Sequence, residues 1–198
     1  MKNYHLLNKK YALLHMKIFV ILILPFAGCY DDKIEQVKDV YVSYFPMQPG
    51  NRWVYETNNL DLTIEISSSI YLNHNLYHEV LRIYDGESDT IYLRGSIDEK
   101  IFINFNRQDY IYVDFLRNEG EIWQSFESFY SKVNKKGLTV QTAAGTFHNV
   151  IEIFTDNTQL SDLYEFNRYA PGVGLVESIG FRRTYRLKRA YVNGITYP

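Results

Sequence analysis

Two histidines four residues apart, His74 and His78, have side chains and a spacing that could bind a metal ion. On an α-helix such a pair would share one face, but the surrounding segment reads as a polar turn followed by a β-strand. Four strand residues span about 13 Å, which is too far for both side chains to reach one ion. The zinc-protease pattern also requires a glutamate where this chain has Asn75. We therefore predict no metal site and no cofactor.

Carboxylates gather in one short stretch, Asp85-Gly-Glu-Ser-Asp89, which holds three acidic residues in five positions. A calcium loop needs more oxygen ligands and a glycine at another position, so a hairpin turn is the favoured interpretation. Sequence alone cannot pair any of the scattered acidic residues as a glycosidase acid and base. These residues are Asp61, Asp98, Glu99, Asp114, Glu119 and Glu121. A hydrolase that uses carboxylates is therefore the least favoured of the functions considered.

A basic run near the C-terminus spans Arg182 to Arg189. In a β-strand, Arg182, Arg186 and Lys188 would share one face, because alternate residues point the same way. Such a stripe on an acidic protein could contact an anionic glycan or a lipid headgroup. The alternative is a solvated strand face whose cations pair with neighbouring carboxylates.

The only cysteine, Cys29, directly follows a segment typical of secreted proteins. Lys17 precedes an apolar run, Ile18 to Leu24, and the small residues Ala27 and Gly28 come just before the cysteine. A basic start, a short apolar region and small residues are typical of a secretory signal. The run is far shorter than the roughly 20 apolar residues of a membrane-spanning helix.

The four residues Phe26-Ala-Gly-Cys29 resemble the bacterial lipobox. The resemblance implies cleavage between Gly28 and Cys29 and transfer of a diacylglycerol to the cysteine thiol. Phe26 departs from the usual leucine at the first position. The alternative is an ordinary cleaved signal that leaves a free thiol, and no second cysteine is present to pair with it. Two or three acyl chains would anchor the protein stably.

We predict three segments: a signal peptide at 1–28, a flexible tether at 29–43 and a β domain at 44–198. Met16 lies directly before the basic and apolar regions and is an alternative translation start. Two acidic residues after the cysteine, Asp31 and Asp32, resemble a surface-export signal of Bacteroidota lipoproteins, although a solvated linker explains them equally well. The predicted location is the cell envelope, with a lipid anchor in the outer membrane and the domain facing the periplasm or the cell surface.

The composition of the predicted mature chain excludes some functions. The whole chain has 21 basic and 23 acidic residues, and residues 1–28 hold four lysines and no acidic residue, which leaves a net charge of −6 after cleavage. Nucleic-acid-binding domains are typically basic, so we predict no nucleic-acid partner. The remaining 170 residues suit a single domain. Eighteen tyrosines and twelve phenylalanines favour β-strands.

Alternating apolar residues predict β-strands along most of the domain. The clearest run spans Leu62 to Leu72, and two further runs joined by Asn106-Arg-Gln-Asp109 predict a β-hairpin. Short links between strands favour antiparallel pairing, because parallel pairs need longer crossovers. We predict an all-β fold with a single antiparallel sheet of about nine or ten strands, and at most a short helix within 121–130.

Four stretches together resemble a group of uncharacterised lipoproteins and secreted proteins of the Bacteroidota. They are FPMQPGNRWVY at 45–55, VDFLRNEGEIW at 113–123, AAGTFHNV at 143–150 and YAPGVGLVE at 169–177. The resemblance implies a mostly antiparallel sheet that is strongly curved or forms a half-barrel, and it brings no catalytic residues. Physically, Pro171-Gly172 suits a tight turn, and Trp53 and Trp123 suit the core.

The predicted function is a lipid-anchored envelope protein that acts as a non-enzymatic binding module for a protein or a glycan, through an exposed sheet face. The alternative is a carrier of lipid or another apolar ligand inside an open half-barrel. An unfilled apolar concave face would favour the carrier, whereas a filled core with aromatic residues outside would favour the binding module.

Overall fold

A computed structural model of the chain describes residues 42–57, 60–160, 163–181 and 183–198. The described residues belong to the second of two structural units, Val37–Pro198. The predicted cleavage and lipid-attachment residues, Gly28 and Cys29, and the predicted patch residue Arg182 lie outside the described residues. Within the described part of the chain, no helix is long and apolar enough to cross a membrane.

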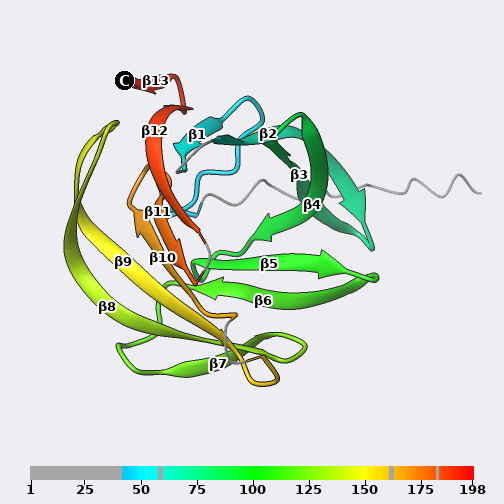
Figure 1. Cartoon of the computed structure of the whole chain (residues 1–198). Helices are drawn as coiled ribbons and strands as arrows, with labels where there is room; N and C mark the ends of the chain where they lie inside the picture. Colours follow the sequence, from blue (N-terminus) through cyan, green and yellow to red (C-terminus); the bar gives the residue numbers. More distant parts are fainter. Residues whose placement is uncertain (1–41, 58–59, 161–162, 182) are drawn as a thin grey trace, which may run out of the picture. The chain divides into compact units, whose positions relative to one another are not determined.

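One antiparallel sheet of thirteen strands accounts for the secondary structure of the described ranges (Figure 1). The strands are β1 (Arg52–Glu56), β2 (Asp61–Leu72), β3 (Asn75–Tyr84), β4 (Glu87–Gly95), β5 (Lys100–Phe105), β6 (Gln108–Asp114), β7 (Ile122–Phe126), β8 (Phe129–Thr142), β9 (Gly145–Asn157), β10 (Glu165–Ala170), β11 (Gly174–Gly180), β12 (Thr184–Val192) and β13 (Ile195–Tyr197). Their order across the sheet is β6-β5-β4-β3-β2-β1-β12-β11-β10-β9-β8-β7, and β13 pairs with β12. The predicted all-β fold and single antiparallel sheet are confirmed.

The sheet curls until its two end strands, β6 and β7, meet through side chains. The indole Nε1 of Trp123 on β7 donates a hydrogen bond to the carbonyl of Ile111 on β6 at 3.3 Å. The ring of Phe126 lies edge-on to Tyr110, with 5.0 Å between the ring centres, and to Phe105 at 4.9 Å. Because its end strands meet, the sheet curves further than an open half-barrel would. The predicted half-barrel is therefore an approximate description.

Two-residue turns set the register of several hairpins. Both central residues have positive φ in the turns Asn73-His74, Asp85-Gly86, Asn106-Arg107 and Asn193-Gly194. Type I′ turns require this backbone, and their twist matches that of the flanking strands. The predicted hairpin turn at Asp85-Gly86 and the hairpin around Asn106 are confirmed.

The predicted number of strands is too low, and one of the predicted turns is wrong. Asn134-Lys-Lys-Gly137 was expected to be a turn, but β8 runs through it to Thr142 and absorbs the polar residues as irregularities in its pairing with β9. A bulge lets a strand accommodate extra residues without ending. The ambiguous segment 121–130 forms β7, a tight turn and the start of β8, and contains no helix.

A segment at the start of the domain closes one end of the curled sheet. Ser43 donates from its amide and its hydroxyl to the carboxylate of Glu99, in the β4–β5 turn, at 2.9 and 2.8 Å. Its carbonyl accepts from the amide of Gly172, in the β10–β11 turn, at 2.6 Å. Phe45 follows and stacks on Trp53, with 5.4 Å between ring centres. The segment therefore spans this end and joins turns from both halves of the sheet.

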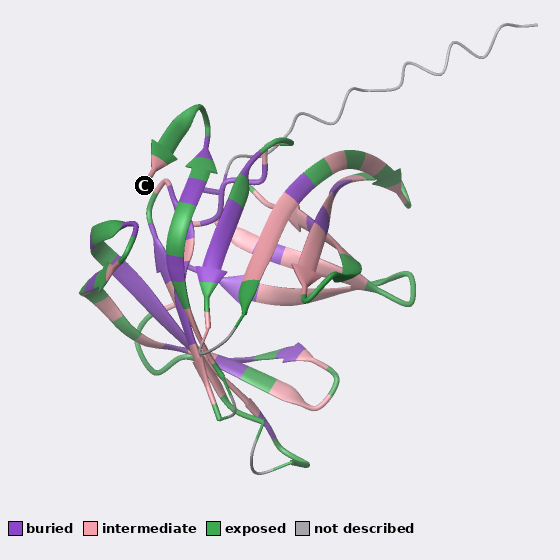
Figure 2. Cartoon of the chain, turned by 45° about the horizontal axis from the view of Figure 1, so that its top comes forward, coloured by how far each residue is buried: buried purple, intermediate pink, exposed green. Residues whose placement is uncertain are grey.

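The hydrophobic core packs against this segment. The middle strands are buried, whereas the hairpin turns are exposed (Figure 2). Trp53 is completely buried, and its Nε1 donates to the carbonyl of Val173 at 2.6 Å. Gly174 follows with a φ of +107°, and a Cβ there would lie 3.2 Å from the Trp53 Nε1. Glycine is required here both for the backbone conformation and for the close approach of the indole. Trp123 is also buried, as expected.

A cluster of polar side chains ties β3, β4, β5 and β6 together around Asp109. The carboxylate accepts hydrogen bonds from Tyr77, from Arg94 at 2.9 Å and from Asn104 at 3.0 Å. Burial alone would raise the pKa of Asp109, but these hydrogen bonds outweigh it and hold the pKa below the usual value of 3.8. Because the folded-state pKa is lowered, the carboxylate stabilises the fold above the unfolded-state pKa, and this contribution is lost as the pH falls below about 4.

We expect Asp109→Asn to lower the free energy of unfolding by about 2 kcal/mol at pH 7, because hydrogen bonds to a charged acceptor are lost. The difference from wild type should shrink as the pH falls below about 4, since the wild-type carboxylate is then protonated too. Urea denaturation at pH 7 and at pH 2.5 measures both values. A difference of equal size at the two pH values would contradict this assignment.

Candidate ligand-binding site

A cavity of about 500 Å³ lies inside the curved sheet. Alternate residues of β2, β3, β4 and β10 point into it, as the two-residue period of a strand requires. The lining residues are Phe45, Tyr55, Leu62, Ile64, Val80, Arg82, Tyr84, Glu87, Ser88, Asp89, Ile91, Leu93, Tyr112, Glu165, Asn167, Tyr169, Leu175, Ser178, Arg183 and Tyr185. The inward positions of Leu62, Ile64, Ile91 and Leu93 agree with the alternation in the sequence.

The cavity is apolar at its closed end and polar at its mouth. Phe45, Leu93 and Tyr169 are buried at the closed end, beneath the segment that joins the β4–β5 and β10–β11 turns. Glu87 and Arg183 are exposed and lie at the opposite end, where β4 and β12 begin. An apolar interior with a few polar groups is the usual composition of a small-molecule site.

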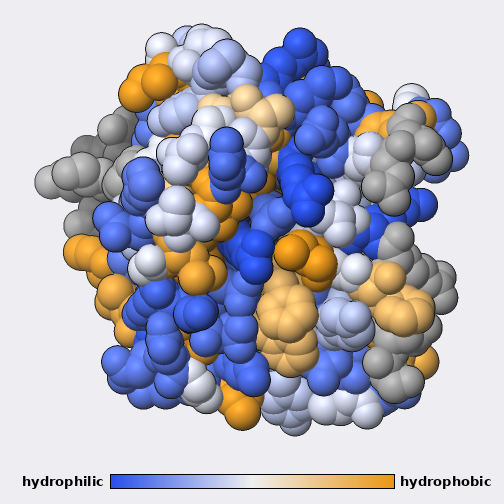
Figure 3. All heavy atoms as spheres, turned by 60° about the vertical axis from the view of Figure 1, so that its left-hand side comes forward, coloured by the Kyte–Doolittle hydropathy of each residue, from blue (hydrophilic) through white to orange (hydrophobic). Residues whose placement is uncertain are grey.

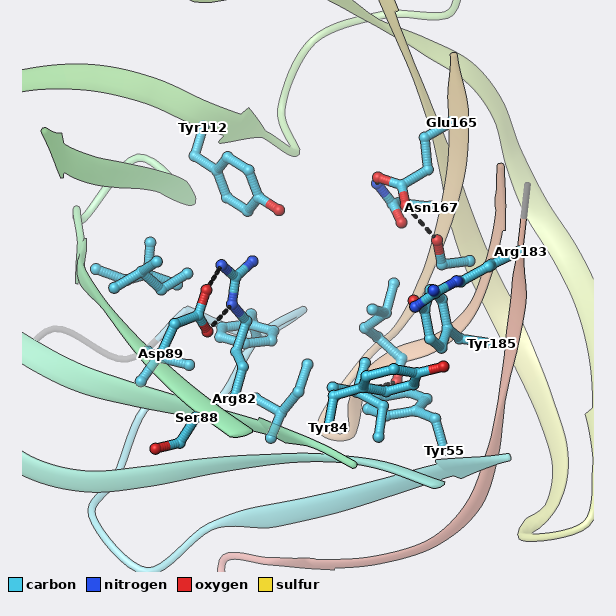
Figure 4. Close-up of a pocket in the computed structure, with 18 of the residues that line it drawn as sticks. Tyr55, Arg82, Tyr84, Ser88, Asp89, Tyr112, Glu165, Asn167, Arg183 and Tyr185 are labelled. Carbon is cyan, nitrogen blue, oxygen red and sulfur yellow. Dashed lines mark hydrogen bonds and ion pairs between the residues drawn. The ribbon is translucent and has the colours of Figure 1, made fainter. Parts of the chain in front are cut away.

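An ion pair of Arg82 and Asp89 occupies one wall of the cavity (Figure 4). The two residues face each other across the β3–β4 hairpin, and the Arg82 Nε lies 2.8 Å from the carboxylate. The hydrogen bonds from Arg82 hold the pKa of Asp89 below its usual value, so the carboxylate is ionised at neutral pH. The pair therefore adds polarity to the wall but little net charge.

Glu165 is the acidic group of the opposite wall (Figure 4). Its carboxylate accepts from the hydroxyl of Ser178 at 2.7 Å and from the amide of Asn167 at 2.8 Å. Burial, together with the charge of Glu165, raises the pKa of Tyr112 to about 12. Tyr112 is therefore a neutral hydroxyl at physiological pH and can donate or accept a hydrogen bond.

Arg183 differs from Arg82, the other cation of the cavity. Its guanidinium lies over the ring of Tyr84, 4.7 Å from the ring centre, and next to Tyr185. Arg82 is paired with Asp89, whereas Arg183 forms no ion pair with any carboxylate of the described residues. The mouth of the cavity thus presents an exposed cation that is held in place by two aromatic rings.

Arg186 and Lys188 of the predicted basic patch lie on the other face of β12. Arg186 pairs with the buried carboxylate of Glu177 at 2.8 Å, and Lys188 pairs with Asp61 at 3.0 Å. Both residues thus make the ion pairs expected of a solvated strand face, and Arg182 lies outside the described residues. Binding of an anionic partner at this patch stays a prediction.

The two histidines do not approach each other as metal ligands would. His74 occupies a turn and is exposed, whereas His78 is buried with its Nδ1 3.1 Å from the hydroxyl of Ser69. Within the described ranges, no group of three or more histidine, cysteine, aspartate or glutamate residues is arranged to hold a metal ion.

Three carboxylates line the cavity, and the environment of one of them, Asp89, does not suit acid catalysis. A general acid needs a raised pKa, and the pKa of Asp89 is lowered by Arg82. Glu165 already accepts hydrogen bonds from Ser178 and Asn167. The third carboxylate, Glu87, lies exposed at the mouth.

The exposed face on the side of β8 and β9 has a mixed character. Figure 3 shows hydrophobic side chains interspersed with hydrophilic ones over this side. A surface of this kind is ordinary for a folded protein, since isolated exposed apolar residues are common. It gives less support to binding through an exposed sheet face than the cavity gives to a ligand inside the sheet.

The polar residues of the cavity were not predicted from the sequence, although one signal was present. A two-residue turn at Asp85-Gly86 pairs Tyr84 with Glu87 and therefore Arg82 with Asp89. The wall formed by Glu165 and Ser178 depends on the pairing of β10 with β11, which the sequence leaves open. The position of Arg183 beside Tyr84 depends on contacts between distant strands, and no local pattern predicts it.

Two comparisons of the sequence found no relatives. No protein-family model matches the chain, and no curated protein matches it.

Two solved structures resemble this one in fold. A protein of Bacteroides fragilis, described as exported and as having a YmcC-like fold, is 15% identical and gives a TM-score of 0.47. The likeness covers 76% of this chain and 99% of that one. A protein of Parabacteroides distasonis, described as a lipoprotein, is 14% identical with a TM-score of 0.49, over 77% of this chain and 100% of that one.

Proposed function

We propose that the protein is a lipid-anchored component of the cell envelope that binds a small amphiphilic molecule in the cavity of its curved sheet. The cavity carries this proposal, because it combines an apolar interior with a polar mouth. Its volume of about 500 Å³ lies within the range of 300 to 1,000 Å³ that is usual for small-molecule sites. Of the two predicted roles, carrier and exposed-face binding module, the cavity favours the carrier.

Arg183 is the group at the mouth that favours an anionic polar group on the ligand, although Glu87 and Glu165 bring negative charge to the same cavity. Arg82 is neutralised by Asp89, whereas Arg183 has no carboxylate partner among the described residues. A carboxylate or phosphate at the mouth would complete a charge-assisted hydrogen bond with the Arg183 guanidinium. The apolar part of the ligand would then lie against residues such as Ile64 and Ile91.

The anchor and the location rest on the sequence. Cys29 and the residues before it resemble a lipobox, which supports attachment of acyl chains and an outer-membrane location. Mass measurement of the mature N-terminus tests this part of the proposal directly. A mature chain that begins elsewhere than Cys29, or whose Cys29 carries no acyl groups, would overturn it.

Filling the cavity tests the binding role. We expect Ile91→Trp to weaken binding of decanoate at least tenfold, because the larger side chain would occupy the space that the apolar chain requires. Ile122→Trp is the matched control, since Ile122 lies on β7, is 61% exposed and does not line the cavity. Isothermal titration calorimetry measures both, and decanol, which has no charge, should bind less tightly than decanoate to the wild type.

Equal affinity of wild type and Ile91→Trp for decanoate would show that the ligand does not enter this cavity. Thermal unfolding of each variant checks that the fold is kept.

A further inference from the structure

One carboxylate of the cavity, Glu165, has no cation among the described residues to balance its charge. It accepts hydrogen bonds from the hydroxyl of Ser178 at 2.7 Å and from the amide of Asn167 at 2.8 Å, and both donors are neutral. None of the ion pairs within the described ranges includes Glu165, whereas Asp89 is paired with Arg82. Because charges in a partly enclosed cavity are less screened than those on the surface, Glu165 favours a ligand that brings a positive charge.

A tyrosine hydroxyl faces Glu165 across the cavity. Figure 4 shows Tyr112 pointing from one wall towards Glu165 and Asn167 on the other. The charge of Glu165 contributes to the raised pKa of Tyr112, so the two groups lie within electrostatic reach of each other. The Tyr112 hydroxyl makes no hydrogen bond with another described residue. A donor placed between the two walls would therefore find a carboxylate on one side and a neutral hydroxyl oxygen on the other.

Arg183 lies level with Glu165 along the strands. Glu165 on β10 pairs with Gly180 on β11, and the Gly180 amide donates to the carbonyl of Arg183, just before β12, at 2.9 Å. Since neighbouring strands lie about 4.8 Å apart, the backbones of Glu165 and Arg183 are about 10 Å apart. Both residues line the cavity. Two groups of opposite charge therefore stand on the same stretch of wall without forming an ion pair.

A glycine occupies the wall between these two charges. Gly180 comes two residues after Ser178, which lines the cavity, so a side chain at position 180 would point the same way. A Cβ there would lie 4.0 Å from the Cγ of Glu165 and 3.5 Å from the carbonyl oxygen of Tyr164, which are ordinary contacts. The φ of Gly180 lies outside the left-handed region, so the backbone does not require glycine either. The absence of a side chain leaves space between Glu165 and Arg183.

We propose that the polar group of the ligand is zwitterionic, with an ammonium group bound between Glu165 and Tyr112 and a phosphate or carboxylate bound to Arg183. The inference rests on the proposed function and names the class of amphiphile that the cavity takes. An ammonium group has three donors and no acceptor, which suits a carboxylate and a hydroxyl oxygen. Because the two charged side chains start from strands that are not neighbours, the opposite charges of the ligand are several bonds apart, as in phosphoethanolamine.

Competition among three lysolipids tests the inference. Lysophosphatidylethanolamine, lysophosphatidylglycerol and lysophosphatidic acid, each with one decanoyl chain, are offered in equal amounts to the full-length protein in mild detergent, and native mass spectrometry identifies the bound lipid. All three carry a phosphate, but only the first carries an ammonium group, and the second has neutral hydroxyls in its place. We expect the wild type to carry about ten times more of the ethanolamine form than of the glycerol form, because charge-assisted hydrogen bonds are stronger than neutral ones.

Three variants assign the preference to residues. Glu165→Gln keeps the size of the side chain and an acceptor for Ser178 but removes the charge, so it should abolish the preference. Glu87→Gln is the matched control, because it removes the exposed carboxylate at the mouth and should leave the preference unchanged. Arg183→Gln should weaken binding of all three lipids, since each carries a phosphate.

Equal binding of the ethanolamine and glycerol forms by the wild type would overturn the zwitterionic assignment, while the cavity would remain a binding site. A loss of preference in Glu87→Gln as large as that in Glu165→Gln would also overturn it. Failure of the wild type to bind any of the three lipids would overturn the proposed function along with the inference, so the two failures are distinguishable. Thermal unfolding checks the fold of each variant, and the competition in the wild type does not depend on them.

Discussion

Replacing Trp53 with alanine is expected to lower the free energy of unfolding by about 4 kcal/mol, the scale found for buried tryptophans. Trp53 is completely buried, stacks on Phe45 and donates a hydrogen bond to the carbonyl of Val173. Loss of the indole would leave an empty space beneath the segment that closes the cavity. The Val173 carbonyl would also lose its hydrogen-bond donor. Urea denaturation followed by circular dichroism measures the change.

Trp53→Phe separates packing from hydrogen bonding. The phenyl ring keeps most of the contact with Phe45 but cannot donate to Val173, so a smaller loss than that of Trp53→Ala is expected, with about 1 kcal/mol of it from the hydrogen bond. Tyr191→Ala, on the paired strand β12 with 49% of the residue exposed, should change the stability by less than about 0.5 kcal/mol. A loss of 1 kcal/mol or less for Trp53→Ala would contradict the central place given to this residue.

Removing the guanidinium of Arg168 is the second large effect that we expect. Arg168 on β10 pairs with two buried carboxylates, Glu152 at 2.7 Å on β9 and Glu177 on β11. Arg168→Met would keep much of the side-chain volume but leave two buried charges without their shared partner. We expect the free energy of unfolding at pH 7 to fall by about 3 kcal/mol, as for other broken buried ion pairs.

Arg186→Met is the matched control for that variant. Arg186 pairs with the same Glu177, but 56% of its side chain is exposed, so its ion pair is weakened by solvent. Loss of such a pair costs about 1 kcal/mol or less. Equal losses for the two variants in urea denaturation would show that burial does not control the strength of this network.

Local patterns in the sequence predicted the parts of the fold that local chemistry determines. Residues with positive φ at Asp85-Gly86 and Asn106-Arg107 fix two hairpins, and strict alternation from Leu62 onward identifies the inward face of β2. These features need only neighbouring residues. Strand type and turn position could therefore be inferred without knowing which strands lie side by side.

Features that depend on distant strands could not be predicted. Polar residues at Asn134–Gly137 resemble a turn, and only their pairing with β9 keeps them within β8. The cavity requires the sheet to curl until β6 meets β7, and the sequence gives no measure of that curvature. Arg183 and Tyr84 are 99 positions apart, and only the curled sheet brings them together.

Native mass spectrometry of the full-length protein, extracted from its own membranes in mild detergent, tests the binding role most directly. We predict that the wild-type protein carries a small amphiphilic molecule that denaturation releases, and that Ile91→Trp carries much less of it. The Ile122→Trp control should carry as much as the wild type. Recovery of the wild type without any bound molecule, or with an amount that Ile91→Trp matches, would contradict the assignment of the cavity as a ligand-binding site.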